Sequence, residues 1–151
     1  SRYTASSEPP FSACTAGNAP IILPDGRVLA CIGPLIQLQT PHPLLLGNLR
    51  EEPLAAIFDR AETNPILHAI RVWGPHVLIR LAAEAGLGDD LPKVYFGNSV
   101  CNACYDLMAS PRVVAFLEEL SRDPAFQRKA AYARVYYLKE TEMVASLGLK
   151  G

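Results

Sequence analysis

The sequence predicts an α+β fold in which one small antiparallel β-hairpin accompanies a helix-dominated remainder. Three observations predict it. Half of the 151 residues are hydrophobic, which is enough to bury a core. Apolar residues recur at helical spacing after several of the 13 prolines, which divide the chain into short segments. Two β-type runs near the start of the chain flank a Pro-Asp-Gly turn, which is typical of a hairpin.

The hairpin is predicted over residues 20–30. Its strands are the apolar runs at residues 21–23 and 27–30. Between them, Pro24-Asp25-Gly26 combines a φ angle preset by proline with the tolerance of glycine for positive φ. Residues 32–48 mix leucines with several Pro and Gly residues and are expected to form an irregular apolar loop.

The remainder is predicted to form roughly five or six helices. Proline is tolerated in the first turn of a helix but breaks its interior, so a proline before an apolar stripe predicts a helix start. Asn64, Ser110 and Asp123 precede three of these prolines as caps. The predicted helix starts are Pro53, Pro65, Pro75, Pro111 and Pro124.

The ends of these helices carry further signals. Glu51 and Glu52 are expected in the first turn of the first helix, where the helix dipole favours acidic residues. Gly86 is expected to cap the third helix. The last helix is predicted over residues 124–147, and residues 94–96 are expected to form a short strand.

Charge and hydropathy exclude two classes of partner. The chain has 14 Lys and Arg against 15 Asp and Glu, for a net charge of -1, which argues against binding nucleic acid by phosphate neutralisation. No apolar run reaches the roughly 18 residues that span a membrane. The start at Ser1, without Met or a signal-peptide pattern, suggests a piece of a longer polypeptide and a cytoplasmic location.

Four cysteines carry the strongest functional signal: Cys14, Cys31, Cys101 and Cys104. The last two form a CxxC motif, and the first two flank the predicted hairpin, whose closure can bring them together. A thioredoxin-type motif would leave Cys14 and Cys31 unexplained, and four buried apolar cysteines are the remaining alternative. A four-thiolate metal site uses all four. Their spacing leaves zinc and iron–sulfur open.

Other candidate residues are expected to be structural. His42, His68 and His76 have neighbours typical of structural or exposed histidines, and we assign them no role. Asp89 and Asp90 are expected in a solvated loop rather than as an acid–base pair. The aromatic residues expected to pack in the core are Trp73, Tyr95, Phe96, Tyr132, Tyr136 and Tyr137.

The order of the motifs adds a family resemblance over about residues 14–107. After Cys14 come Pro24-Asp25-Gly26-x-Val28-x-x-Cys31, then Leu46-Gly47-Asn48-Leu49-x-Glu51-Glu52-Pro53-Leu54-x-x-Ile57, then the CxxC. This order resembles the C-terminal auxiliary-cluster region of radical S-adenosylmethionine enzymes, called SPASM or, in its shortened form, twitch.

The resemblance implies a site and a division of the chain. A full SPASM domain has more cysteines and two clusters, so the four present here resemble the twitch type, in which Cys14, Cys31, Cys101 and Cys104 would ligate one [4Fe–4S] cluster. Residues 1–12 would then be a linker, residues 13–108 the cluster domain and residues 109–151 a C-terminal helical extension. The extension has neither Cys nor His, so it is expected to supply no metal ligand.

The resemblance also implies what this chain does and what it lacks. The auxiliary cluster would transfer an electron to or from a substrate radical, and the domain would close the substrate cavity over a peptide or another small molecule. The CxxxCxxC motif that binds the catalytic cluster and S-adenosylmethionine is absent, so that barrel would lie upstream and this chain alone should not be catalytic. The alternative is a structural zinc-binding module that interacts with another protein.

Overall fold

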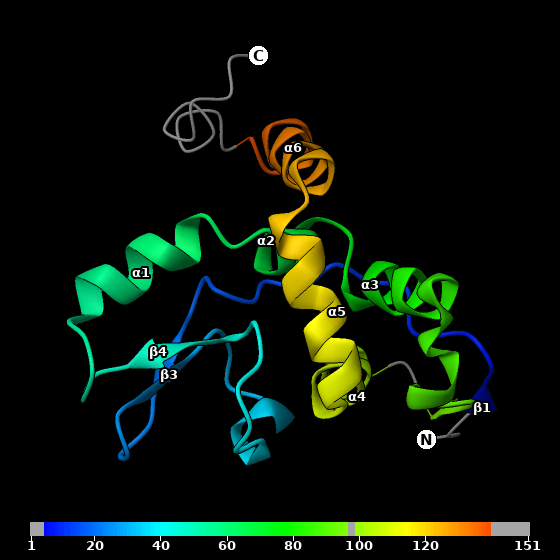
Figure 1. Cartoon of the computed structure of the whole chain (residues 1–151), viewed down its shortest axis with the longest axis horizontal. Coiled ribbons are helices and arrows are strands. Elements are labelled where there is room, and N and C mark those ends of the chain that lie inside the picture. The colour runs from blue at the N-terminus through cyan, green and yellow to red at the C-terminus, as the bar shows by residue number, and fades with distance from the viewer. Residues whose placement is uncertain (1–4, 97–98, 140–151) are drawn as a thin grey trace.

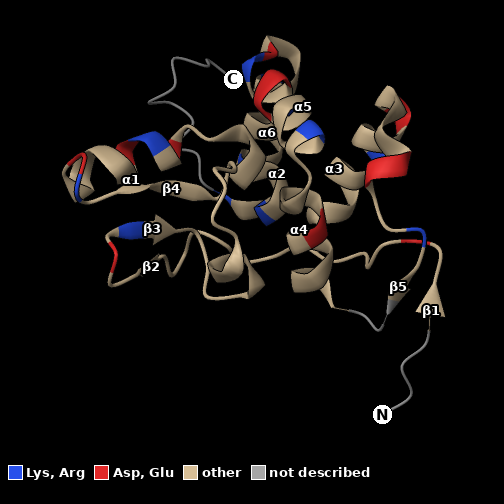
Figure 2. Cartoon of the chain, turned by 60° about the horizontal axis from the view of Figure 1, so that its bottom comes forward, with Lys and Arg blue, Asp and Glu red and all other residues tan. Residues whose placement is uncertain are grey.

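The computed structural model describes residues 5–96 and 99–139 (Figure 1). Over these residues the fold is α+β and mostly helical, as predicted. A three-stranded antiparallel sheet and a two-stranded pair lie at opposite ends, with helices between them (Figure 1). Charged residues of both signs are interspersed over the elements (Figure 2).

The strands are β1 (Ala5–Ser6), β2 (Ile21–Ile22), β3 (Arg27–Leu29), β4 (Leu45–Asn48) and β5 (Tyr95–Phe96). The α-helices are α1 (Leu54–Glu62), α2 (Pro65–Val72), α3 (Pro75–Ala82), α4 (Val100–Ala109), α5 (Pro111–Arg122) and α6 (Pro124–Ala133). Shorter helical turns are η1 (Pro34–Gln37), η2 (Ala83–Leu87), η3 (Gly88–Asp90) and η4 (Arg134–Leu138).

Four of the five predicted helix starts are confirmed, because α2, α3, α5 and α6 begin at their prolines. The side chains of Asn64, Ser110 and Asp123 accept hydrogen bonds from first-turn amides, as their cap positions predict. The first helix differs, since α1 begins one residue after Pro53.

The prediction that Glu51 and Glu52 lie in the first turn of that helix is wrong, since both precede it. Glu52 instead accepts two hydrogen bonds of 2.7 Å from the guanidinium of Arg60. Arg60 also donates to the carbonyl of Leu46 at 2.8 Å, which ties α1 to β4.

The predicted hairpin is confirmed by the pairing of β2 with β3 and by positive φ at Gly26. However, the expectation of an irregular loop over residues 32–48 is wrong at its end, where β4 pairs with the other edge of β3. Gly47 explains why the sequence hides this strand: a Cβ there would lie 2.7 Å from the side chain of Ile57. Glycine weakens the strand signal but lets α1 pack closely on β4.

The predicted strand at residues 94–96 is present as β5. Its partner is β1, which lies within the predicted linker over residues 1–12. The start of the described chain is therefore fixed to the segment that leads into the CxxC motif.

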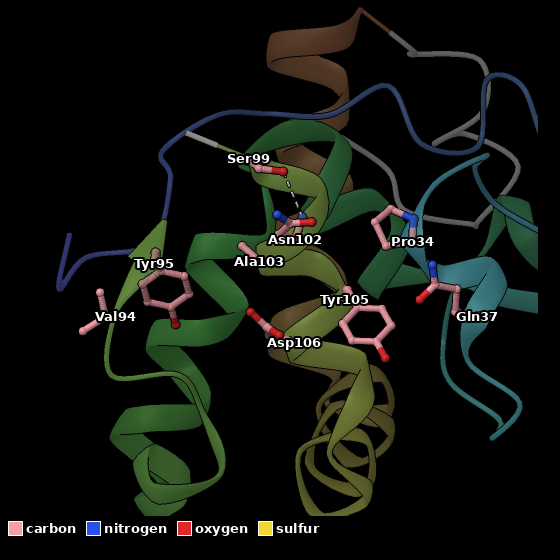
Figure 3. Close-up of a pocket in the computed structure, with 9 residues that line it drawn as sticks. All are labelled: Pro34, Gln37, Val94, Tyr95, Ser99, Asn102, Ala103, Tyr105 and Asp106. Atoms are coloured by element: carbon pink, nitrogen blue, oxygen red, sulfur yellow. Dashed lines mark hydrogen bonds between the residues drawn. The ribbon is translucent and has the colours of Figure 1, made fainter. Parts of the chain in front are cut away.

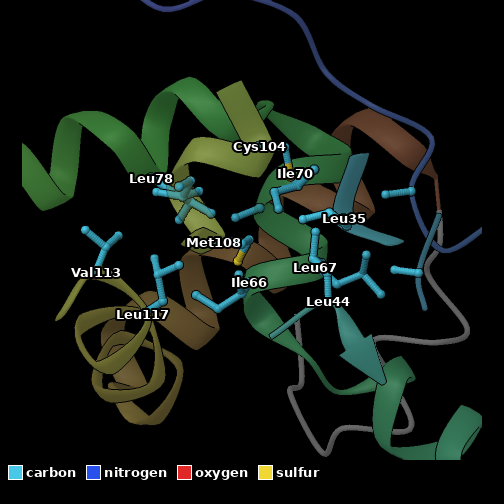
Figure 4. Close-up of a cluster of buried hydrophobic side chains, with 14 of the residues drawn as sticks. Leu35, Leu44, Ile66, Leu67, Ile70, Leu78, Cys104, Met108, Val113 and Leu117 are labelled. Carbon is cyan, nitrogen blue, oxygen red and sulfur yellow. The ribbon is translucent and has the colours of Figure 1, made fainter. Parts of the chain in front are cut away.

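Helix α2 is the centre of the core and packs against α3, α5 and α6 (Figure 4). The same hydrophobic cluster contains Val113, Leu117 and Phe126 from the predicted C-terminal extension. The described part of that extension therefore shares one core with the rest of the fold.

The last predicted helix is shorter than expected. Helix α6 ends at Ala133, the π-helical turn η4 follows, and Lys139 has a positive φ of 59°. The remainder of the prediction, over residues 140–147, lies outside the described residues.

Arg134 holds the turn η4 against the end of α1. Its guanidinium is fully buried and donates to the carbonyl of Glu62 at 3.2 Å, with the Glu62 carboxylate 3.6 Å away. This contact could not be predicted from the sequence, because arginine is rarely fully buried.

The aromatic residues divide into two groups. Tyr95 is buried and Trp73 packs partly against the core, as predicted. The prediction is wrong for the three tyrosines near the end of the described chain, which face outward on either side of Arg134 in the sequence. Their exposed fractions are 56% for Tyr132, 74% for Tyr136 and 66% for Tyr137. The side chain of Phe96 lies outside the described residues.

Asp89 and Asp90 do not form an acid–base pair. The Asp89 side chain is 99% exposed and pairs with Lys93, whereas Asp90 pairs with Arg112 at 3.0 Å. Gly86 has the positive φ of a capping residue, but it lies inside the π-helical turn η2 after α3 has ended. In the described part of the chain, every helix is too short or too polar to cross a membrane.

Candidate metal centre

Cys14 is placed by the junction between α2 and α3. Its amide donates to the carbonyl of Ile70 at 3.2 Å. Two residues earlier, Ser12 lies against Gly74, where an added Cβ would be 1.9 Å from the Ser12 carbonyl oxygen. Gly74 also has a φ of +95°, which disfavours any other residue. This contact fixes the backbone that leads into Cys14.

Cys31 follows β3 and is placed beside the Cys14 segment by the sheet. The amide of Gly17 donates to the carbonyl of Ala30 at 2.7 Å, and the amide of Ala30 donates to the carbonyl of Leu44 at 2.9 Å. The first bond joins a residue just after Cys14 to the residue just before Cys31. This is the closure of the hairpin ends that the predicted hairpin implies.

Cys101 and Cys104 lie in the first turns of α4, a helix that the sequence analysis did not identify. Ser99 caps it by accepting from the amide of Asn102 at 3.2 Å. A serine just ahead of the motif is the signal that could have revealed the helix. The helix packs against η1, which begins three residues after Cys31. This packing brings the CxxC motif near the cysteines that flank the hairpin.

The four thiols are close enough to act on one another electrostatically. Burial raises the pKa of the Cys104 thiol, and Cys31, Cys14 and Cys101 raise it further. Burial also raises the pKa of Cys31, with additional effects from Cys14 and Cys101. The structure therefore brings together all four cysteines, which come from three separate segments.

The exposure of the thiols is graded. Cys104 is 8% exposed at the edge of the core cluster that contains Ile70 (Figure 4), Cys14 and Cys31 are half-buried, and Cys101 is exposed. Within residues 5–96 and 99–139, no group of three or more His, Cys, Asp or Glu is arranged to hold a single metal ion. The four thiols therefore lie in one region of the fold but are not arranged around a single ion.

The three histidines are buried rather than arranged around these thiols. His42 is the clearest case: its Nδ1 accepts from the amide of Leu44 at 3.2 Å, and burial, followed by the charge of Arg27, lowers its pKa from 6.5 to about 4. His42 is therefore neutral in the folded protein near pH 7.

We expect the folded chain to lose stability below pH 6.5 because of His42. The unfolded state binds a proton there more readily than the folded state, so the contribution is lost as the pH falls from about 6.5 towards 4. Between pH 7 and pH 5 the loss should be about 2 kcal/mol. His42→Asn keeps an acceptor but cannot titrate in this range. Urea unfolding at both pH values should show a smaller decrease for the variant, and an unchanged decrease would contradict the assignment.

A cavity of about 440 Å³ adjoins the CxxC motif and was not anticipated from the sequence (Figure 3). It lies between β5, η1 and α4, and its wall includes Asn102 and Ala103 from within the CxxC motif. The residues that line it are Pro34, Gln37, Val94, Tyr95, Ser99, Asn102, Ala103, Tyr105 and Asp106.

Comparisons with protein-family models, with curated proteins and with solved structures found no match to this chain.

Proposed function

We propose that this chain is the auxiliary-cluster domain of a radical S-adenosylmethionine enzyme, in which Cys14, Cys31, Cys101 and Cys104 hold one [4Fe–4S] cluster. The gathering of four thiols from three segments is the observation that supports this proposal most. The order of motifs around them, which resembles the twitch type, supplies the link to this enzyme class.

Four thiolates can hold either one zinc ion or one [4Fe–4S] cluster. A tetrahedral zinc with bonds of about 2.3 Å would hold its sulfur ligands about 3.8 Å apart. A [4Fe–4S] cluster spreads four thiolates over four irons, so its ligands stand further apart. The order of motifs around the thiols, rather than the distances between them, favours the cluster.

When bound, the cluster would supply one-electron transfer to or from a substrate radical. The role of the chain is to hold and partly shield it. Buried Cys104 forms the protected side, at the edge of the hydrophobic core. Exposed Cys101 and Ile32, which is 75% exposed, form the open side.

We assign that open side to contact with an upstream barrel of the same polypeptide, where the domain would close the cavity for a peptide or small-molecule substrate. The high pKa of the Cys31 and Cys104 thiols means that metal binding must displace their protons, so loading should weaken at acidic pH. A reducing cytoplasm, which keeps such thiols free, is the compartment that suits this chemistry.

Redox titration of the anaerobically reconstituted chain tests the proposed function. We expect visible absorbance to bleach on addition of dithionite and to return on reoxidation, because the cluster accepts and releases one electron. Zinc has no redox chemistry, so a colourless, unresponsive zinc-loaded chain would support the structural module instead.

A further inference from the structure

The cavity beside the metal centre has the dimensions of a small-molecule site. Its volume of about 440 Å³ falls within the range of roughly 300–1,000 Å³ that is typical of ligand pockets. Polar groups from separate elements line it: the Gln37 amide from η1, the Tyr95 phenol from β5, and Asn102, Tyr105 and Asp106 from α4 (Figure 3).

Among the described residues, one formal charge lines this cavity. Asp106 is the one charged residue in that part of the lining, and it is also the one charged residue of α4. Its side chain is half-buried, and in the described part of the chain it forms no ion pair and no hydrogen bond. Partial burial of an uncompensated carboxylate costs free energy, which a cation in the cavity would recover.

Two aromatic rings flank this carboxylate. Tyr95 and Tyr105 lie on either side of Asp106 (Figure 3). Tyr95 is 6% exposed, and the Asp106 charge is close enough to act on its phenol. An aromatic ring attracts a cation through the negative potential of its face, by about 0.5–2 kcal/mol. The carboxylate and the two rings therefore both favour a positively charged ligand.

We propose that this cavity binds a small organic molecule through a protonated amino group held at Asp106. The start of α4, at Ser99, carries the positive end of the helix dipole and would repel a cation. The amino group therefore belongs at the Asp106 end of the cavity and the uncharged body of the molecule towards Ser99 and Asn102.

This inference goes beyond the proposed function, because it concerns binding and is independent of which metal the thiols hold. The two sites are nevertheless adjacent. Asn102 and Ala103 lie between the CxxC cysteines, and Pro34 and Gln37 belong to the turn that follows Cys31. A molecule in the cavity would therefore lie next to the metal centre.

Three probes of similar shape test the proposal on the full reconstituted chain: cyclohexylamine, cyclohexanol and cyclohexanecarboxylate, titrated calorimetrically at pH 7. We expect the amine to bind at least about 10-fold more tightly than the other two. Asp106→Asn should weaken amine binding by about 10-fold or more, the scale of a lost hydrogen bond to a charged group. Asp59→Asn, the same change on the exposed face of α1, should leave binding unchanged.

A second variant, which is expected to strengthen amine binding, controls for the case in which Asp106→Asn loses binding only because it fails to fold. Gln37 is exposed at the cavity wall, so Gln37→Glu should preserve the fold and tighten amine binding several-fold. Stronger binding of the carboxylate probe, or full amine affinity in Asp106→Asn, would overturn the proposal. Visible absorbance of the same samples reports the metal centre separately, so failure of one proposal can be distinguished from failure of the other.

Discussion

Cys104→Ser is expected to abolish the proposed metal centre, with at least a 10-fold decrease in iron bound per chain after anaerobic reconstitution. Cys104 is the most buried of the four thiols, and its pKa is raised by burial and by the other three cysteines. A serine hydroxyl is a harder ligand that loses its proton far less readily than a thiol, whereas iron–sulfur clusters favour soft thiolates. Iron quantified colorimetrically against protein concentration measures the effect.

Ala103→Ser is the matched control, since it places the same side chain one position earlier on the same buried turn of α4. It should keep its iron. Cys101→Ser should retain more iron than Cys104→Ser, because Cys101 lies on the exposed side where water can enter as a substitute ligand. A Cys104→Ser chain with the iron content and spectrum of the unaltered chain would show that Cys104 is not a ligand.

Gly74→Ala is expected to cause a large decrease in the free energy of unfolding. The positive φ costs about 1–2 kcal/mol for a residue with a Cβ. That Cβ would also lie 1.9 Å from the Ser12 carbonyl oxygen, so the backbone must move, at a further cost of about 1–3 kcal/mol. A total of about 2–5 kcal/mol is a large part of the 5–15 kcal/mol that stabilises a typical domain.

The same substitution should weaken metal retention, because the displaced Ser12 segment leads directly into Cys14. Urea unfolding followed by circular dichroism measures the stability. Gly88→Ala is the control: its φ is -57° and no atom lies within 4 Å of the added Cβ, so stability should be unchanged or slightly higher. Equal midpoints for the two variants would contradict the close packing of Gly74 on Ser12.

Local signals in the sequence were sufficient to predict several elements of this fold. A cap followed by proline located α2, α5 and α6, because both residues act within one helical turn. The Pro-Asp-Gly turn located the hairpin in the same way. That turn also predicted that the flanking cysteines approach each other, as the bond from Gly17 to Ala30 shows.

The missed parts depend on contacts between distant segments. Gly47 lets α1 pack closely on β4, and glycine gives no strand signal by itself. Arg134 is buried and the tyrosines near it are exposed, which is the reverse of the usual burial preferences of these residue types. The reason is that Arg134 takes the interior position, where it bonds to Glu62. The cavity around Asp106 forms only when β5, η1 and α4 assemble.

The identity of the metal centre tests the central claim most directly. The chain should be reconstituted anaerobically with iron and sulfide, with zinc present in a parallel sample, and its metal and acid-labile sulfide measured together with its absorbance. We predict a brown protein with a broad band near 400 nm and about four irons and four sulfides per chain. A colourless protein with one zinc, or a chain that binds neither metal while all four thiols remain reactive, would contradict the account.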